Sequence, residues 1–180
     1  MRSFKEDVER AVAFHGHLCS GQCLGVKMAH MGMRLLGLDN ETDRKKIMVF
    51  VECNRCPADA IMITTGCSIG KRTYYFKDMG KAAATFLNLE TGKAVRVKRI
   101  SHRYAAEGEE MIEFYANLPE EGYLEAQEVT VTLGKGDWPG PPVCAEICEC
   151  CGEEVTDDRH IVVDGKVLCK ACAREINYYD

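Results

Sequence analysis

Residues 148–172 read CECCGEEVTDDRHIVVDGKVLCKAC, a stretch that contains two Cys-x2-Cys pairs separated by 17 residues. Each pair places two thiolates on one face of a tight turn, and two such turns complete a tetrahedron around Zn²⁺. Because four cysteine ligands leave no open coordination position, we expect a structural zinc ion rather than a catalytic one. The predicted ligands are Cys148, Cys151, Cys169 and Cys172.

The sequence between and after the two pairs predicts a treble-clef zinc finger. Residues 161–168 read as a β-hairpin with Asp164 and Gly165 at its turn. Residues 171–178 read as a helix, and a ribbon followed by a helix is the treble-clef layout. Since so short a segment cannot fold on an apolar core of its own, we expect metal binding to drive its folding.

Other interpretations of these cysteines are less favourable. Unpaired cysteines in a packed core have no reason to show this double spacing. Cys150 competes with Cys151 for one ligand position, but Cys151 has the better spacing and is followed by Gly152. A redox Cys-x2-Cys motif normally comes as a single pair on a thioredoxin-type unit.

A Gly/Pro-rich segment at residues 134–143 precedes the zinc finger and holds three of the five prolines. Such a composition predicts a semi-rigid linker. We therefore expect three parts: a core domain at residues 1–133, the linker at 134–143, and the zinc-finger domain at 144–180.

The core domain mixes helical and strand patterns without strict alternation, which predicts an α+β fold. Ser3 and Glu6 have the spacing of a capping box at the start of the first helix. Helices are expected at residues 4–13, at 58–64 and at 107–117, and another is expected to carry residues 24–36 and to stop near Gly37. Strands are expected at residues 47–51, 72–76, 83–89, 94–100 and 127–133.

A second group of metal-binding side chains lies near the N-terminus. Imidazole and thiolate are ligands of zinc and of other borderline or soft metals. His17 and Cys19 precede a helix whose N-terminal dipole favours a thiolate. The alternative is that a buried cysteine is simply a small apolar side chain, and Cys23 and Cys53 fit that role best. The whole group comprises His15, His17, Cys19, Cys23, Cys53, Cys56 and Cys67.

Charge and composition exclude several functions. The chain carries a net charge of −5, and residues 144–180, with nine acidic and four basic residues, account for all of it. Zinc fingers that bind DNA are basic, so nucleic acid is not an expected partner. The sequence has no apolar run long enough for a membrane helix and no secretory signal. Eleven cysteines then predict reduced thiols in a cytoplasmic protein.

Three motifs resemble those of the formylmethanofuran dehydrogenase E-subunit family. Residues 14–21, FHGHLCSG, resemble its FHGHxCPG signature, with Ser20 in place of the usual proline. Residues 56–71 are similar to its second motif, and residues 75–81 to its third. The C-terminal cysteine pairs resemble the finger that some members append.

This resemblance implies an α+β core that dimerises and a metal site in its cleft. The implied ligands are His17 and Cys19, with Cys56 and Cys67 close by. His15 is either an alternative ligand or lies just behind the ligands. The implied metal is a second transition-metal ion, with zinc as the first candidate.

Two functions remain open. The family's named dehydrogenase performs its redox chemistry on a molybdenum or tungsten pterin in other subunits. This chain is therefore expected to be an accessory protein of a larger oxidoreductase rather than the redox catalyst itself. Alternatively, it is a free-standing enzyme whose core metal keeps an open position, with His15 or Lys77 as acid–base group.

Overall fold

The computed structural model describes residues 1–174. The chain divides into two compact units, Met1–Val131 and Thr132–Asp180. No helix in the described part is both long and apolar enough to cross a membrane.

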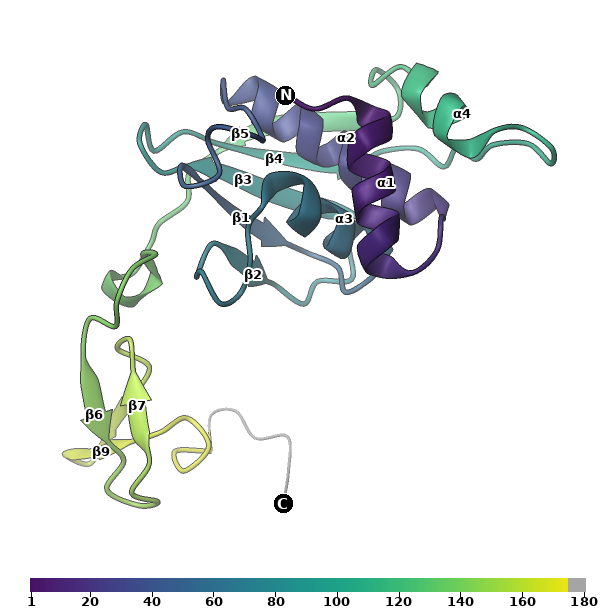
Figure 1. Ribbon diagram of the computed structural model, residues 1–180. Coiled ribbons are helices and arrows are strands. Elements are labelled where there is room, and N and C mark those ends of the chain that lie inside the picture. The colour runs from purple at the N-terminus through teal and green to yellow at the C-terminus, as the bar shows by residue number, and fades with distance from the viewer. Residues whose placement is uncertain (175–180) are drawn as a thin grey trace. The chain divides into compact units, whose positions relative to one another are not determined.

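The first unit is built on a five-stranded mixed sheet with the strand order β2-β1-β3-β4-β5 (Figure 1). β1 and β2 are parallel, and the remaining neighbours are antiparallel. The crossover between the two parallel strands contains α3. The strands are β1 (Ile47–Val51), β2 (Tyr74–Phe76), β3 (Ala83–Asn88), β4 (Ala94–Arg99) and β5 (Leu124–Val129). This arrangement confirms the predicted α+β class.

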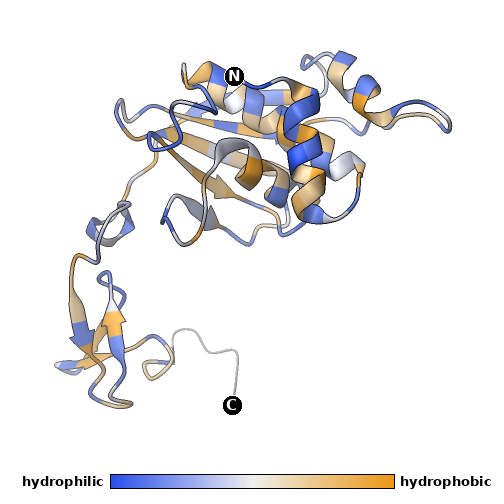
Figure 2. Cartoon of the chain, viewed as in Figure 1, coloured by the Kyte–Doolittle hydropathy of each residue, from blue (hydrophilic) through white to orange (hydrophobic). Residues whose placement is uncertain are grey.

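Helices α1, α2 and α3 cover one face of the sheet (Figure 1). All six residues of β3 are buried, and Figure 2 shows apolar residues along the central strands. The helices are α1 (Phe4–His15), α2 (Ser20–Leu35), α3 (Cys56–Thr65) and α4 (Met111–Asn117). The largest fully buried side chains include Met28, Met33, Ile47, Ile61, Phe86, Tyr115 and Tyr123.

Two glycines let α2 lie close to its neighbours. A Cβ atom on Gly25 would lie 2.5 Å from the carbonyl oxygen of Pro57 in α3. A Cβ atom on Gly32 would overlap the ring of Phe86 in β3. Side chains at these positions would therefore push α2 away from both α3 and the sheet.

The N-terminal capping box is present. The Ser3 hydroxyl accepts the Glu6 amide at 3.3 Å, and the Glu6 carboxylate accepts the Ser3 amide at 2.8 Å. α1 ends at Gly16, whose φ of 95° is a left-handed conformation that favours glycine. The helix thus includes His15, two residues beyond its predicted end.

A buried polar network attaches α1 to α2 and to the loop that follows it. The carboxylate of Asp7 is fully buried and accepts hydrogen bonds from Arg2 at 2.5 Å and from Asn40 at 2.6 Å. It also lies 2.7 Å from Nε2 of His30. Burial alone would raise the pKa of Asp7, but the hydrogen bonds with His30 and Arg2 outweigh it and hold the pKa below its ordinary value.

The last strand of the sheet differs from its predicted position. β5 covers Leu124–Val129, whereas residues 127–133 were expected. Its extent follows from pairing with β4, because Leu124 lies opposite Arg99 and Val129 lies opposite Ala94, where the β3–β4 turn ends. The alternation of apolar residues beyond Val129 therefore has no strand partner in the described sheet.

The second unit contains two small antiparallel hairpins. β6 (Ala145–Ile147) pairs with β7 (Glu154–Thr156), and β8 (Ile161–Val163) pairs with β9 (Lys166–Leu168). The φ angles of 50° at Asp164 and 79° at Gly165 form the predicted hairpin turn. Residues 170–174 are turns, and the second half of the helix expected at 171–178 lies outside the described residues.

The start of the expected linker forms part of the second unit. A short 3₁₀ turn, η1 (Lys135–Asp137), brings Asp137 within 2.5 Å of the Arg159 guanidinium. A Cβ atom on Gly136 would overlap the backbone carbonyl of Asp157. Residues 135–137 therefore make specific contacts rather than serving only as a spacer.

Candidate metal centres

Three N-terminal side chains converge at the junction of α1 and α2. The donor atoms of His15, His17 and Cys19 all lie within 4.8 Å of one another. His15 ends α1, and Cys19 is the N-cap of α2. The left-handed turn at Gly16 reverses the chain between them, so the two helix ends bring the donors together.

His15 is held in an orientation that suits a metal ligand. Its Nδ1 lies 2.8 Å from a carboxylate oxygen of Asp59 in α3. Its Nε2 is buried and has no hydrogen-bond partner among the described residues. When Asp59 accepts the Nδ1 proton, Nε2 carries a free lone pair, which is the arrangement of a carboxylate–histidine–metal site. A metal ion would satisfy this buried atom.

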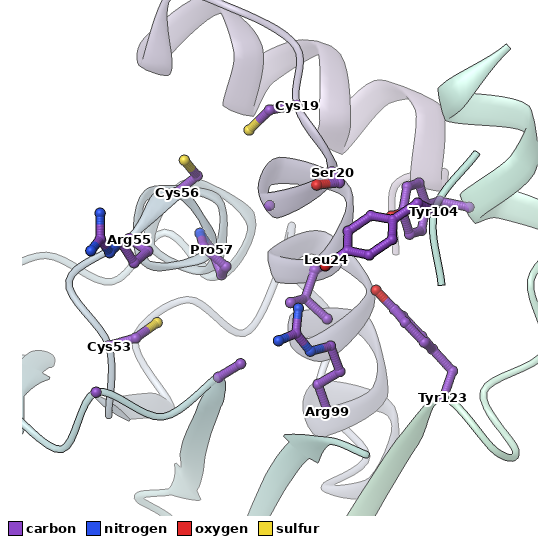
Figure 3. A pocket seen from close by; sticks show the side chains of 14 residues that line it. Cys19, Ser20, Leu24, Cys53, Arg55, Cys56, Pro57, Arg99, Tyr104 and Tyr123 are labelled. Carbon is purple, nitrogen blue, oxygen red and sulfur yellow. The ribbon is translucent and has the colours of Figure 1, made fainter. Parts of the chain in front are cut away.

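Cys56 supplies a possible fourth donor. It is the first residue of α3, and Figure 3 shows the sulfur of Cys19 directed toward it. Burial and then a hydrogen bond with the Cys19 thiol raise the pKa of Cys56. A Cβ atom on Gly21 would lie 2.8 Å from that of Cys56, so the glycine allows this close approach. The structure thus brings His15, His17 and Cys19 together, and Cys56 lies beside Cys19 but outside this group of mutually close donors.

Cys67 lies elsewhere. It follows the C-terminal end of α3, and a helix of 10 residues separates the two ends by about 15 Å. Its thiol donates to the carbonyl of Ile47 at 3.6 Å and is 2% exposed. Burial raises the pKa of Cys67 to about 11. The structure therefore does not bring Cys67 to the expected cluster, and its thiol packs in the core.

Other cysteines of the N-terminal group are passive or peripheral. Cys23 is fully buried in α2, and burial raises the pKa of its thiol to about 12. Cys53 is 5% exposed and lines the pocket described below. Lys77, the other expected acid–base group, lies 5.9 Å from the Phe50 ring and does not line this pocket.

The four C-terminal cysteines form the second cluster. Their sulfur atoms all lie within 4.8 Å of one another, and those of Cys151 and Cys169 are 4.0 Å apart. Zinc–sulfur bonds of about 2.3 Å in a tetrahedron place sulfurs about 3.8 Å apart. The cluster therefore has the dimensions of a Cys₄ zinc site. Its members are Cys148, Cys151, Cys169 and Cys172.

Backbone amides prepare this cluster for a cation. The amides of Cys151 and Cys169 donate to the Cys148 sulfur and lower the pKa of that thiol to about 6. The Cys169 amide lies 3.2 Å from this sulfur. The turn around the first pair thus favours the thiolate form of Cys148, which is the form that binds metal.

A pocket of about 360 Å³ adjoins the N-terminal cluster (Figure 3). Cys19 belongs to both, and Cys56 lines the pocket beside it. No sequence motif points to two of its polar residues, Arg99 and Tyr123, which come from β4 and from the residue before β5. The lining residues are Cys19, Ser20, Gly21, Leu24, Cys53, Arg55, Cys56, Pro57, Gly80, Ala82, Arg99, Tyr104, Tyr115 and Tyr123.

Comparison with known proteins identifies both parts of the chain. Residues 14–130 match the family described as FmdE, Molybdenum formylmethanofuran dehydrogenase operon, so the chain belongs to the FmdE family. Residues 145–178 match the prokaryotic dksA/traR C4-type zinc finger. The cysteine cluster and this match together support a structural zinc ion in the second unit.

Two similar proteins extend this comparison. A tungsten formylmethanofuran dehydrogenase FmdE-like protein from Syntrophus aciditrophicus shares the fold, with a TM-score of 0.60 and 22% identity over 99% of this chain and 96% of that one. A "Probable S-adenosyl-L-methionine-binding protein" of Archaeoglobus fulgidus is 37% identical over 91 residues. That match spans 49% of this chain but 25% of the Archaeoglobus protein.

Proposed function

We propose that the core of this FmdE-family chain binds one transition-metal ion, with zinc as the first candidate. The observation that carries the proposal is the buried, unpartnered Nε2 of His15, which Asp59 orients from the other side of the ring. His17 and Cys19 supply the other two converging donors, and Cys56 lies beside Cys19. The mixed nitrogen and sulfur set suits zinc and related divalent metals.

We further propose that the chain is an accessory protein of a larger molybdenum- or tungsten-dependent oxidoreductase and acts as a homodimer. The family description, with its reference to a molybdenum formylmethanofuran dehydrogenase operon, supports this role. The Syntrophus relative, which is named for a tungsten formylmethanofuran dehydrogenase, supports it as well. In this role the metal ion would stabilise the chain or be passed to the partner enzyme.

A second candidate function is that of a free-standing metal-dependent enzyme, which the adjoining pocket favours. A catalytic zinc ion keeps three protein ligands and one open position. His15, His17 and Cys19 would provide the three, and the pocket would admit a substrate beside them. The metal would supply Lewis-acid chemistry, while Asp59 fixes the tautomer of His15.

Metal analysis of the anaerobically purified protein tests the core site. We expect about two metal ions per chain, one in the core and one in the finger. Cys19→Ala should lose the core ion, and Cys148→Ser should lose the finger ion. Cys67→Ala is the matched control and should retain both, because Cys67 lies outside the cluster. An equal metal content in wild type and Cys19→Ala would overturn the core site.

The two roles differ in the coordination of the core ion. The Co²⁺-substituted Cys148→Ser variant, with cobalt confined to the core, would be titrated with azide and followed by visible absorption. A change in the cobalt bands would show an exchangeable position and favour the enzyme. Unchanged bands would show a closed ligand set, with Cys56 as the fourth ligand, and favour the accessory role.

A further inference from the structure

The pocket beside the core site has the electrostatic character of an anion site. Among the described residues that line it, the charged ones are Arg55 and Arg99, and no carboxylate is present. Neither guanidinium forms an ion pair with a residue in the described part of the chain. Figure 3 shows Arg99 reaching up beside Leu24 toward the centre of the pocket, with Arg55 on the opposite side near Cys56.

Two helix N-termini add to this positive potential. α2 begins at Ser20 and α3 begins at Cys56, and both residues line the pocket. Neither helix has a side-chain hydrogen bond at its N-cap, and the first turn of α2 contains no acidic residue. The N-terminal dipole of α2 therefore favours a negative charge in the cavity, whereas Asp59 in the first turn of α3 offsets part of the dipole of that helix.

The remaining walls are suited to an organic molecule. Leu24, Pro57 and Ala82 contribute apolar surface, and the rings of Tyr104, Tyr115 and Tyr123 form one side. Tyr115 and Tyr123 are 1% and 2% exposed, so their rings are fixed in the core. A volume of about 360 Å³ lies within the usual range for small-molecule sites. Bare inorganic anions would leave these apolar walls without a partner.

We propose that this pocket binds a small organic carboxylate, with its carboxylate on Arg99 and its apolar body between Leu24 and the tyrosines. A guanidinium matches a carboxylate through paired N–H donors, which gives both strength and orientation. The other end of the ligand then faces Cys19 and Cys56. This inference rests on the proposed core site for its functional meaning, because it identifies the class of molecule presented to the metal ligands.

Benzoate is a suitable probe because it combines a carboxylate with a flat apolar body. Binding would be measured by isothermal titration calorimetry on the full-length protein, with benzamide as the neutral isostere and inorganic phosphate as the bare anion. We expect benzoate to bind and to be at least about tenfold tighter than either comparison ligand.

Two arginine variants test the assigned contact. Arg99→Gln should weaken benzoate binding at least about tenfold, and Arg99→Lys should recover part of it because the charge remains. Arg103→Gln is the matched control, since Arg103 is exposed on the following loop and does not line the pocket. Circular dichroism on each variant would establish that it is folded.

Three outcomes would overturn the proposal. Benzamide binding as tightly as benzoate would show an apolar pocket without anion selectivity. Phosphate binding more tightly than benzoate would show a site for inorganic anions. If Arg99→Gln leaves benzoate binding unchanged and removal of the core metal abolishes it, benzoate is a ligand of the metal itself. That result would refute the carboxylate contact with Arg99 and support the proposed core metal site. If benzoate binding depends on Arg99 in a protein that contains no core metal, the result would support the proposed carboxylate pocket and count against the proposed core metal site.

Discussion

Asp59→Asn is the most informative change at the core site, because Asp59 touches the cluster through one ring nitrogen. Its carboxylate lies 2.8 Å from Nδ1 of His15, while the opposite nitrogen, Nε2, is the buried unpartnered atom. Asparagine keeps the size of the side chain and removes its charge. The change therefore tests the orientation and basicity of His15 without removing a ligand.

The size of the effect follows from the exposure of this contact. Loss of such an outer partner costs about 10- to 100-fold in metal affinity, or about 1.4 to 2.7 kcal/mol. The Asp59 side chain is 40% exposed, so solvent screens part of its charge. We therefore expect the lower part of that range, about 10- to 30-fold.

Competition with a chromophoric zinc chelator would measure this affinity. Asp78→Asn is the matched control, because Asp78 is exposed and outside the cluster. Asp59 also lies in the first turn of α3, where its charge favours the helix, so urea unfolding would be measured in parallel. A core-metal affinity within about twofold of wild type would refute the role of Asp59 and, with it, the assignment of Nε2 as a ligand.

Three further predictions concern the scaffold. Asp7→Asn should lower the free energy of unfolding in urea by about 3 to 5 kcal/mol, since it breaks a buried charged network. The folded state lowers the pKa of Asp7, so the wild-type carboxylate should stabilise the fold at pH values above the ordinary carboxyl pKa. This stabilisation should be lost as the pH falls through the folded pKa. Gly32→Ala should cost about 1 to 3 kcal/mol in the same assay, whereas Gly70→Ala, whose Cβ atom meets open space, should be neutral. The midpoint temperature of thermal unfolding should not depend on the thiols below about pH 9 and should fall as the pH rises toward 12. The pKa values of Cys23 and Cys67 are raised in the folded state, so these thiols lose their protons at lower pH in the unfolded state. A midpoint temperature that stays unchanged up to pH 11 would contradict the burial of both thiols.

The two candidate metal centres differ in how far local sequence specifies them. The finger ligands occupy two short turns joined by a hairpin, so the spacing of the cysteines already fixes which sulfurs can meet. The same holds for His15, His17 and Cys19, which a single turn at Gly16 brings together. The spacing of residues along the chain is therefore sufficient to predict a metal site wherever residues close together in the sequence supply its donors.

Long-range packing determined the rest of the core site. Cys56 and Cys67 were expected together from the resemblance, but the helix between them carries one to Cys19 and the other to β1. The contact of Asp59 with His15 depends on how α3 packs against α1, and no local pattern encodes that packing. Arg99 reaches the pocket because β4 ends there, which only the sheet register determines.

The two centres also differ in what holds their ligands in place. Helices α1, α2 and α3 pack on a buried apolar core, with Gly25 and Gly32 allowing close contact, so the core donors converge on a scaffold that is stable by its own packing. The finger has two three-residue hairpins whose strands are largely exposed, and it lacks a comparable apolar core in the described residues. Metal binding therefore contributes folding free energy in the second unit. In the first unit the scaffold is already formed, so a metal ion at the proposed core site would be free to exchange or to contact a ligand in the adjoining pocket.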